Sequence, residues 1–321
     1  MSIQTNFSYK PPLFLSNGHL QTIYPTFLRK LDHAFYQRER ITTPDDDFLD
    51  LDWSCKGNNR LAILSHGLEG SSFRPYMVGM VLALNKCGWD ALAWNYRSCS
   101  GEINRQLRFY HNGATDDLDI VVEHACKKGL YKSIALIGFS MGGNLSLVYL
   151  GEKGKKIHSL ISKSIVFSVP CDLEASAAKL AHPLNMIYMR RFLRMLHKKV
   201  TEKMRLFPDR ISDDGYEKIK DFKGFDDRYT APIHGFKNAE DYWRRCSSNN
   251  YIPGIKIKTL IINAANDPFL SEECFPIKQT KDHQYVSLEI PKSGGHVGFE
   301  SFNAEGMYWS EKRALQFLNT D

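Results

Sequence analysis

Short apolar segments alternate with segments of helical periodicity along most of the chain. Leu49, Leu51 and Trp53 alternate with Asp50 and Asp52, a period of two that is typical of a strand with one buried face. Further segments are short and almost wholly apolar, which favours strands covered on both faces. These segments are Leu61–Ser65, Ala91–Asn95, Ile134–Phe139, Ile165–Val169, Thr259–Asn263 and Val286–Ile290.

Helical periodicity fills the intervals between these strands. Apolar residues recur at helical spacing in Tyr76–Lys86, Thr115–Lys128, Leu145–Tyr149 and Met307–Leu318. Thr115 is followed by acidic residues, which predicts a side-chain cap and a favourable interaction with the helix dipole. Strands and helices that alternate with short connections predict an α/β fold, with a mostly parallel central sheet and helices on both faces.

Residues 174–258 interrupt this alternation of strands and helices. Apolar residues recur at helical spacing from Met189 to Val200, and arginines and lysines occupy most of the other faces. We therefore predict an α/β core made of residues 1–173 and 259–321, with residues 174–258 inserted as a cap.

Composition indicates an ordinary globular protein. The 321 residues are 43% hydrophobic and 24% charged, which argues against a disordered or collagen-like chain. No run of residues approaches the ~20 consecutive apolar positions of a membrane-spanning helix. The seven cysteines are scattered and form no CxxC pair, which favours a reducing compartment over a disulfide framework or zinc ribbon. The polar segment Met1–Lys10 lacks the apolar stretch of a secretory signal, so we expect a cytoplasmic protein.

The formal net charge of +6 is concentrated in the predicted cap. Residues 174–258 contain 18 Lys and Arg against 11 Asp and Glu, a net of +7, whereas the rest of the chain has a net of −1. In one interpretation a Met- and Leu-rich face lines the substrate pocket while the cations stay solvated. In another, the basic helix makes peripheral contact with an anionic membrane. No recognised nucleic-acid-binding motif accompanies the charge, so nucleic acid is not an expected partner.

The segment Gly138-Phe139-Ser140-Met141-Gly142 contains the most specific chemical motif. It is G-x-S-x-G between a predicted strand and a predicted helix, which is the pattern of a nucleophile elbow. A serine on so sharp a turn has a strained backbone, and the positions two residues away need to lack a Cβ. Ser140 is therefore the candidate nucleophile. A haloalkane dehalogenase or an epoxide hydrolase would need a carboxylate at this position.

A serine nucleophile needs a base, and the base needs an acid that orients it. Asp267 follows the predicted strand Thr259–Asn263, and His296 follows the predicted strand Val286–Ile290. Both are therefore expected at the edge where parallel strands end and where open sheets place their sites. We predict Asp267 as the acid and His296 as the base, with Asp172 as a rival acid.

The loop His66-Gly67-Leu68-Glu69-Gly70-Ser71 follows another predicted strand. We expect the backbone N–H groups of Leu68 and of Met141, the residue after the nucleophile, to form an oxyanion hole. His66 is expected to hold the loop by hydrogen bonds rather than to take part in the chemistry.

Together these motifs resemble the α/β-hydrolase superfamily and, within it, the YheT-like branch, which includes EMB8-like plant proteins and fungal medium-chain acyltransferase/esterases. The branch is indicated by Phe14–Ile23, by the loop His66–Ser71, and by Asn95-Tyr96-Arg97 leading to Tyr110-His111. The resemblance extends from about residue 10 to residue 318. It implies serine-dependent hydrolysis or transfer of small-molecule acyl esters, without a metal or an organic cofactor.

Two further features come with this resemblance. His111 and Asp116 fit the pattern H-x-x-x-x-D, in which the histidine of glycerolipid acyltransferases deprotonates an acceptor alcohol. Thr115 and Asp116 also stand where a helix cap is needed, so we favour a structural role. Asn17–Ile23 is expected either to support the site loops or to contact substrate.

Three hypotheses for function follow from the sequence. The first is a carboxylic-ester hydrolase that uses Ser140, His296 and Asp267. The second is an acyltransferase that passes the acyl group to an alcohol or a thiol. The third is a former hydrolase that only binds a ligand, against which the complete set of catalytic candidates argues.

Overall fold

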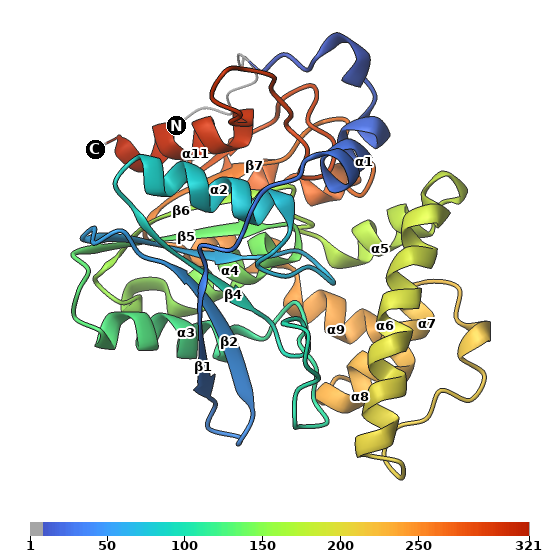
Figure 1. Ribbon diagram of the computed structural model, residues 1–321. Coiled ribbons are helices and arrows are strands. Elements are labelled where there is room, and N and C mark those ends of the chain that lie inside the picture. The colour runs from blue at the N-terminus through green and yellow to red at the C-terminus, as the bar shows by residue number, and fades with distance from the viewer. Residues whose placement is uncertain (1–8, 321) are drawn as a thin grey trace.

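Strands β1 to β8 form one mixed sheet at the centre of the protein (Figure 1). The structure is a computed structural model that describes residues 9–320. The prediction about a secretory signal concerns Met1–Lys10, which lies mostly outside the described residues. The strands lie in the order β1-β2-β4-β3-β5-β6-β7-β8. The first two pairings are antiparallel, and β4, β3, β5, β6, β7 and β8 are parallel to one another. The bounds are β1 Gln37–Thr42, β2 Phe48–Ser54, β3 Arg60–Ser65, β4 Asp90–Asn95, β5 Ser133–Phe139, β6 Ile161–Phe167, β7 Lys258–Ile262 and β8 Val286–Glu289.

Helices cover both faces of this sheet. On one face, α2 (Pro75–Lys86) and α11 (Trp309–Asn319) pack on the sheet with Met80, Leu84 and Ala314 buried. On the other face, α3 (Thr115–Lys127) and α4 (Met141–Lys153) bury apolar residues against the same strands. Helix α1 (Gly18–Leu28) contacts α2, and the short helix α10 (Ile277–Thr280) contacts β8. The predicted fold class is confirmed.

The N-terminal hairpin differs from the prediction. β1 was not predicted, because its residues are exposed or half-exposed and show no apolar alternation. β2 was expected to have one exposed face, but all of its residues are buried. Its polar face is covered because Arg40 and Arg38 lie directly opposite Asp50 and Asp52 and hydrogen-bond to these carboxylates at 2.7–2.9 Å.

Two element ends also differ. β6 begins at Ile161, four residues before the expected start, and ends at Phe167, because Ser168 has a positive φ of 53° that breaks the extended backbone. Thr115 does not cap α3. It occupies the first helical position, and its hydroxyl donates instead to Glu152 of α4 at 2.7 Å.

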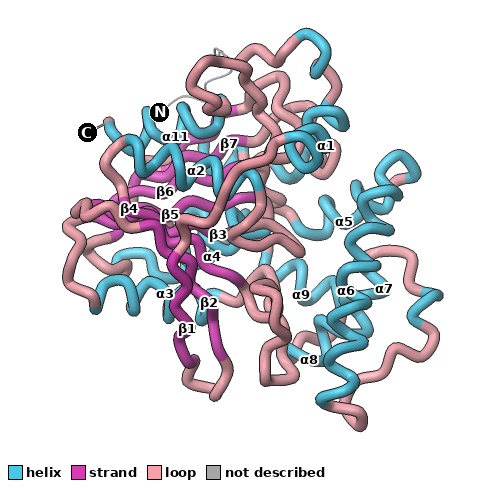
Figure 2. Tube along the Cα trace, viewed as in Figure 1, coloured by secondary structure: helices cyan, strands magenta, loops and turns pink. Residues whose placement is uncertain are grey.

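The connection between β6 and β7 contains five α-helices, shorter 3-10 and π turns and, within the part of the chain described, no strand. We call residues 173–246 the helical segment. Figure 2 shows it as a group of helices beside one end of the sheet. Its helices are α5 Leu173–Ala181, α6 Met186–Leu206, α7 Phe222–Phe225, α8 Ala231–His234 and α9 Ala239–Cys246.

The helical segment begins and ends at one point of the core. The Leu173 N–H donates to Ser247 Oγ at 3.0 Å, and the Asn249 N–H donates to the Cys171 carbonyl at 3.1 Å. The segment has its own apolar cluster, which includes the buried α6 residues, and it packs on Phe109 and Phe269 of the core.

Two lysines of α6 are not solvated, contrary to the interpretation that the cations of this region all face water. The Lys199 ammonium forms an ion pair with Glu69 at 2.7 Å. Lys203 is buried and donates to the carbonyls of Asn104 and Gln106. Both anchor α6 to loops of the core. Among the described residues, no helix has the length and apolar character required to cross a membrane.

Candidate active site

Ser140 occupies a strained turn between β5 and α4. Its φ of 53° and ψ of −120° lie in a region that a side chain with a Cβ rarely adopts. Hydrogen bonds on both sides hold this conformation. The Ser140 N–H donates to the Phe167 carbonyl at 2.8 Å, and the Ser140 carbonyl accepts from Gly143 and Asn144 at 2.9 and 3.1 Å. The turn is therefore fixed by the strand on one side and by the helix on the other.

Close packing around this turn explains the two glycines of the motif. A Cβ at Gly138 would lie 2.4 Å from the Gly142 carbonyl oxygen, and a Cβ at Gly142 would lie 2.2 Å from the Ser65 carbonyl oxygen. Neither contact is possible for a real side chain. The elbow can therefore pack this closely against the end of β3 only because both positions lack a Cβ.

The structure brings Ser140, His296 and Asp267 together in one hydrogen-bonded chain. His296 Nε2 lies 2.9 Å from Ser140 Oγ, and His296 Nδ1 lies 2.9 and 3.1 Å from the two carboxylate oxygens of Asp267. The side chains of His296 and Asp267 are 10% and 0% exposed. Because the carboxylate accepts from Nδ1–H, Nε2 is left to accept the serine proton. Asp172 is not part of this chain, since its carboxylate caps α5 by accepting from the Ala175 N–H.

Helix α1 supports the two loops that contain His296 and Asp267. Thr22 Oγ1 accepts from the His296 N–H at 2.9 Å. Gln21 is fully buried, and its side-chain oxygen accepts from Asn266 Nδ2 at 2.9 Å and from the Gly294 N–H at 3.0 Å. The N-terminal motif thus supports the site loops, one of the two roles expected for Asn17–Ile23.

The loop after β3 lies beside Ser140 and is held by side chains from other elements. His66 is fully buried. Its Nδ1–H donates to the Gly67 carbonyl at 2.8 Å, and its Nε2 accepts from the Tyr96 N–H at 3.3 Å. Burial lowers the pKa of His66 to about 3, so the ring is neutral and structural. Within residues 9–320, the N–H groups of Leu68 and Met141 have no hydrogen-bond acceptor, and both residues line a cavity at Ser140.

Glu69, next to Leu68, connects this loop to the helical segment. Its φ is 53°, an uncommon conformation for a residue other than glycine. The Glu69 carboxylate accepts from the Tyr110 hydroxyl at 2.6 Å and from the Lys199 ammonium at 2.7 Å, and the Glu69 N–H donates to the same hydroxyl at 3.0 Å. Lys199 also donates to Cys99 Sγ at 3.1 Å. No motif in the sequence indicated this pair.

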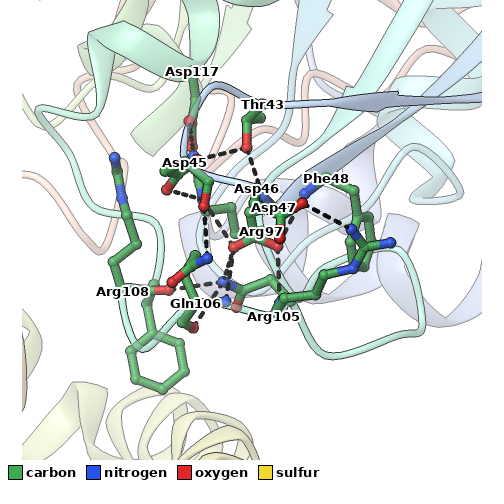
Figure 3. A network of polar contacts seen from close by, with 12 residues as sticks. Thr43, Asp45, Asp46, Asp47, Phe48, Arg97, Arg105, Gln106, Arg108 and Asp117 are labelled. Atoms are coloured by element: carbon green, nitrogen blue, oxygen red, sulfur yellow. Dashed lines mark hydrogen bonds and ion pairs between the residues drawn. The ribbon is translucent and has the colours of Figure 1, made fainter.

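A buried ionic network fixes the loop that leads to Tyr110 and His111. Figure 3 shows Arg97 at its centre. The Arg97 guanidinium binds Asp45 and Asp47 of the β1–β2 turn at 2.8 Å, and Asp117 of α3 at 2.7 Å. This network ties the hairpin, the loop and α3 together, so the cavity wall that the loop supplies has a fixed position.

His111 and Asp116 do not form the pair that the H-x-x-x-x-D pattern suggests. Asp116 binds Arg108 at 2.8 Å, while His111 Nδ1 accepts from the Gly113 N–H at 3.1 Å. Burial lowers the pKa of His111 well below its usual value, and the nearby His234 and Arg108 contribute smaller effects in the same direction. Both residues thus have structural contacts, but neither Thr115 nor Asp116 caps α3 with its side chain, so the reason for expecting a structural role was wrong. His111 also lines a cavity.

Two cavities meet at Ser140. Both are lined by Leu68, Ser140, Phe192, Phe269 and His296. The first cavity extends under the helical segment, and most of its additional lining is aromatic or aliphatic. These lining residues include Phe109, Leu173, Leu180, Leu196, Phe222, Phe225, Tyr229 and Trp243.

Asp226 is an acidic residue in the wall of this first cavity. Its carboxylate accepts from Trp243 Nε1 at 2.8 Å and from Thr230 Oγ1 at 2.5 Å. Burial raises the pKa of Asp226 to about 7. Methionine contributes less than expected. Of the methionines in the helical segment, only Met195 lies at either cavity in the described chain, and it lines the second.

The second cavity opens on the other side of Ser140. Its wall is formed by α1, the loop after β3 and one face of α6. Thr22, Ile23 and Phe27 come from α1, and Arg74 and Arg191 contribute positive charge.

Comparison with known proteins places the chain in a family. Residues 63–301 match the sequence profile of the alpha/beta hydrolase fold. The chain is an alpha/beta hydrolase. It is 33% identical to YheT of Escherichia coli, a protein named provisionally as an esterase, over 95% of this chain and 91% of the relative. It is also 30% identical to the mouse phospholipase ABHD3, over 91% of this chain and 73% of that protein.

Other matches agree with this placement. The embryogenesis-associated protein EMB8 of Picea glauca is 26% identical over 95% of this hydrolase and 70% of the plant protein. An esterase structure from Pyrococcus furiosus superposes with a TM-score of 0.59 at 21% identity, covering 89% of this chain and 92% of that one, which shows the shared fold. The predicted resemblance to the YheT-like branch is confirmed, and the hydrolase belongs to an esterase- and lipase-type family.

Proposed function

We propose that this hydrolase cleaves carboxylic acyl esters through a serine acyl-enzyme. The proposal rests on the hydrogen-bonded chain from Ser140 through His296 to Asp267. The distance between Ser140 Oγ and His296 Nε2 suits proton transfer from the serine to the histidine. The serine stands on a strained elbow where two cavities meet, so a substrate can reach it with one part on each side.

Each residue then has a defined role. Ser140 Oγ attacks the ester carbonyl while His296 takes its proton and later gives that proton to the departing alcohol. Asp267 orients His296 and stabilises the imidazolium. The Leu68 and Met141 N–H groups bind the oxyanion, and one such donor contributes about 10²–10³ in kcat. Water, activated by His296, finally cleaves the acyl-enzyme.

The acyl group fits the first cavity best. This cavity is mostly apolar and is covered by the helical segment, so it offers small, medium-length or lipid-like acyl chains an environment away from water. Relatives named as a phospholipase and as a monoacylglycerol lipase favour lipid-like esters.

Transfer of the acyl group to an alcohol or a thiol is the alternative that shares the same acyl-enzyme. The His111 and Asp116 pair offers this alternative no support, because Asp116 binds Arg108 instead. Competition between water and an added alcohol during turnover separates hydrolysis from transfer. A transferase is identified if the transfer product exceeds the free acid at an acceptor concentration far below that of water.

Labelling with a fluorophosphonate, followed by a chain-length series of p-nitrophenyl esters, tests the proposal. We expect labelling of the wild type, and for Ser140→Ala neither labelling nor more than about 10⁻⁴ of the wild-type kcat. Ser133→Ala, at the other end of β5, is the matched control and keeps both properties. Full labelling and activity of Ser140→Ala contradict the proposal, and a wild type without either property favours the ligand-binding hypothesis.

A further inference from the structure

Two arginines of the second cavity lack a carboxylate partner. Arg74 immediately precedes α2, and Arg191 lies on α6, and both line the cavity together with Ser140 and His296. Arg74 donates to the Glu69 carbonyl at 2.8 Å. Within residues 9–320, neither arginine forms an ion pair with Asp or Glu. Arg191 is exposed to solvent along part of its side chain. Partial burial and the nearby positive charge of Arg74 lower the pKa of Arg191, so the two cations influence each other.

The negative charge in this wall is already compensated. Glu69 is the one acidic residue among the described residues that line the second cavity. The Lys199 ammonium lies 2.7 Å from its carboxylate, and the Tyr110 hydroxyl donates to the same oxygen at 2.6 Å. Glu69 therefore does not neutralise Arg74 or Arg191, and this side of Ser140 retains positive charge.

The two sides of Ser140 thus differ in chemistry. The first cavity offers mainly aromatic and aliphatic walls, whereas the second combines apolar α1 residues with two guanidinium groups. Guanidinium forks match the oxygens of phosphates and carboxylates, and two adjacent cations repel until an anion lies between them. A serine hydrolase holds the acyl group on one side of its nucleophile and the leaving alcohol on the other.

We propose that Arg74 and Arg191 bind an anionic group, a phosphate or a carboxylate, on the alcohol part of the ester. This inference rests on the proposed function and specifies its substrate class as acyl esters whose leaving group is negatively charged. This site also orients the substrate. The acyl chain then lies under the helical segment, and the anionic group lies between the start of α2 and α6.

Matched pairs of substrates test the site. One pair is 1-decanoylglycerol and its 3-phosphate, and the other is 4-(butanoyloxy)benzoate and the neutral amide 4-(butanoyloxy)benzamide. We expect kcat/KM to favour the anionic member of at least one pair by about 10-fold, since one charged hydrogen bond contributes about that factor. The pair that shows the preference identifies the anion as phosphate or carboxylate.

Variants on α6 show whether the preference arises in the cavity. Arg191→Met is expected to reduce the anionic-to-neutral ratio of kcat/KM about 10-fold, and Arg191→Lys to restore part of it. Arg194→Met is the matched control, because Arg194 is exposed on the same helix and does not line either cavity. This control retains the wild-type ratio. Inorganic phosphate should inhibit cleavage of the neutral ester competitively, and less so in Arg191→Met.

The outcomes separate this inference from the proposed function. Cleavage of the neutral esters without any anionic preference overturns the anion site and leaves the serine mechanism intact. An equal loss of preference in Arg191→Met and Arg194→Met also overturns it, since the effect would then come from the general surface charge. Neutral-ester cleavage that persists in Ser140→Ala contradicts the proposed function instead.

Discussion

The ion pair between Lys199 and Glu69 allows a quantitative test of how the helical segment is attached to the site. Lys199→Met removes the cation but keeps much of the side-chain volume, which leaves the Glu69 carboxylate buried with only the Tyr110 hydroxyl to compensate it. The two side chains are 14% and 3% exposed. Removing one partner of a buried pair costs about 3–5 kcal/mol, and the partial exposure of Lys199 places this pair near the lower value, at about 3 kcal/mol.

This free energy converts to a change in melting temperature. At about 2.1 cal/mol/K per residue, unfolding of a chain of this length has an entropy of about 0.7 kcal/mol/K. A loss of about 3 kcal/mol therefore lowers Tm by about 4 °C. Because Leu68 precedes Glu69, we also expect the oxyanion donor to shift and kcat to fall about 10-fold.

Calorimetry and ester hydrolysis measure the two effects. Lys198→Met is the matched control, since Lys198 is the exposed neighbour, and its Tm should stay within about 1 °C of the wild type. The double variant Lys199→Met/Glu69→Gln removes both charges and should recover most of the lost Tm. The reasoning is refuted if Lys199→Met behaves like Lys198→Met, or if the double variant is less stable than Lys199→Met.

Three further predictions concern the site loops, the first cavity and the surface of α6. Thr22→Val removes the acceptor of the His296 N–H, so kcat should fall about 10-fold. Thr22→Ser keeps the acceptor and should keep most of the activity. Equal losses of kcat in the two variants, measured in steady-state assays, would contradict this role of Thr22. Burial raises the pKa of Asp226 to about 7, so its carboxyl becomes charged as the pH rises through 7 and then opposes an apolar acyl chain. KM for an octanoyl ester should therefore rise several-fold between pH 6 and pH 8.5, whereas KM for an acetyl ester should not. If the rise in KM persists in Asp226→Asn, the ionisation of Asp226 is not its cause. The exposed cations of α6 predict binding to anionic vesicles that weakens with added salt; co-sedimentation that is absent or insensitive to salt would remove the predicted membrane contact.

The parts of the site that follow from local rules could be predicted from the sequence. The nucleophile elbow depends on steric contacts within a few residues of Ser140, so its glycines reveal it. Asp267 and His296 each follow a short apolar strand, and parallel strands end at the same edge of the sheet. Two short sequence patterns thus predicted that Asp267 and His296 lie at one edge of the sheet, and the structure shows them 2.9 Å apart.

The parts that depend on distant contacts could not be predicted. Gln21 binds the backbone of Gly294, and Lys199 binds Glu69, and neither contact leaves a periodic pattern in the sequence. From a sequence pattern alone, charged residues are expected to be exposed to solvent, because the pattern does not show which of them form buried ion pairs. Asp50 is buried in β2 only because Arg40 of the unpredicted strand β1 covers it.

The helical segment leaves and rejoins the core at one point, where Leu173 binds Ser247 and Asn249 binds Cys171. Residues 173–246 can therefore be exchanged for another segment while β6 and β7 stay in register. Such an exchange would leave Ser140, His296 and Asp267 in place, because all three lie outside residues 173–246. The exchange offers evolution and protein engineering a route to new acyl specificity, provided that the new segment replaces the contacts that Lys199 and Lys203 make with loops of the core.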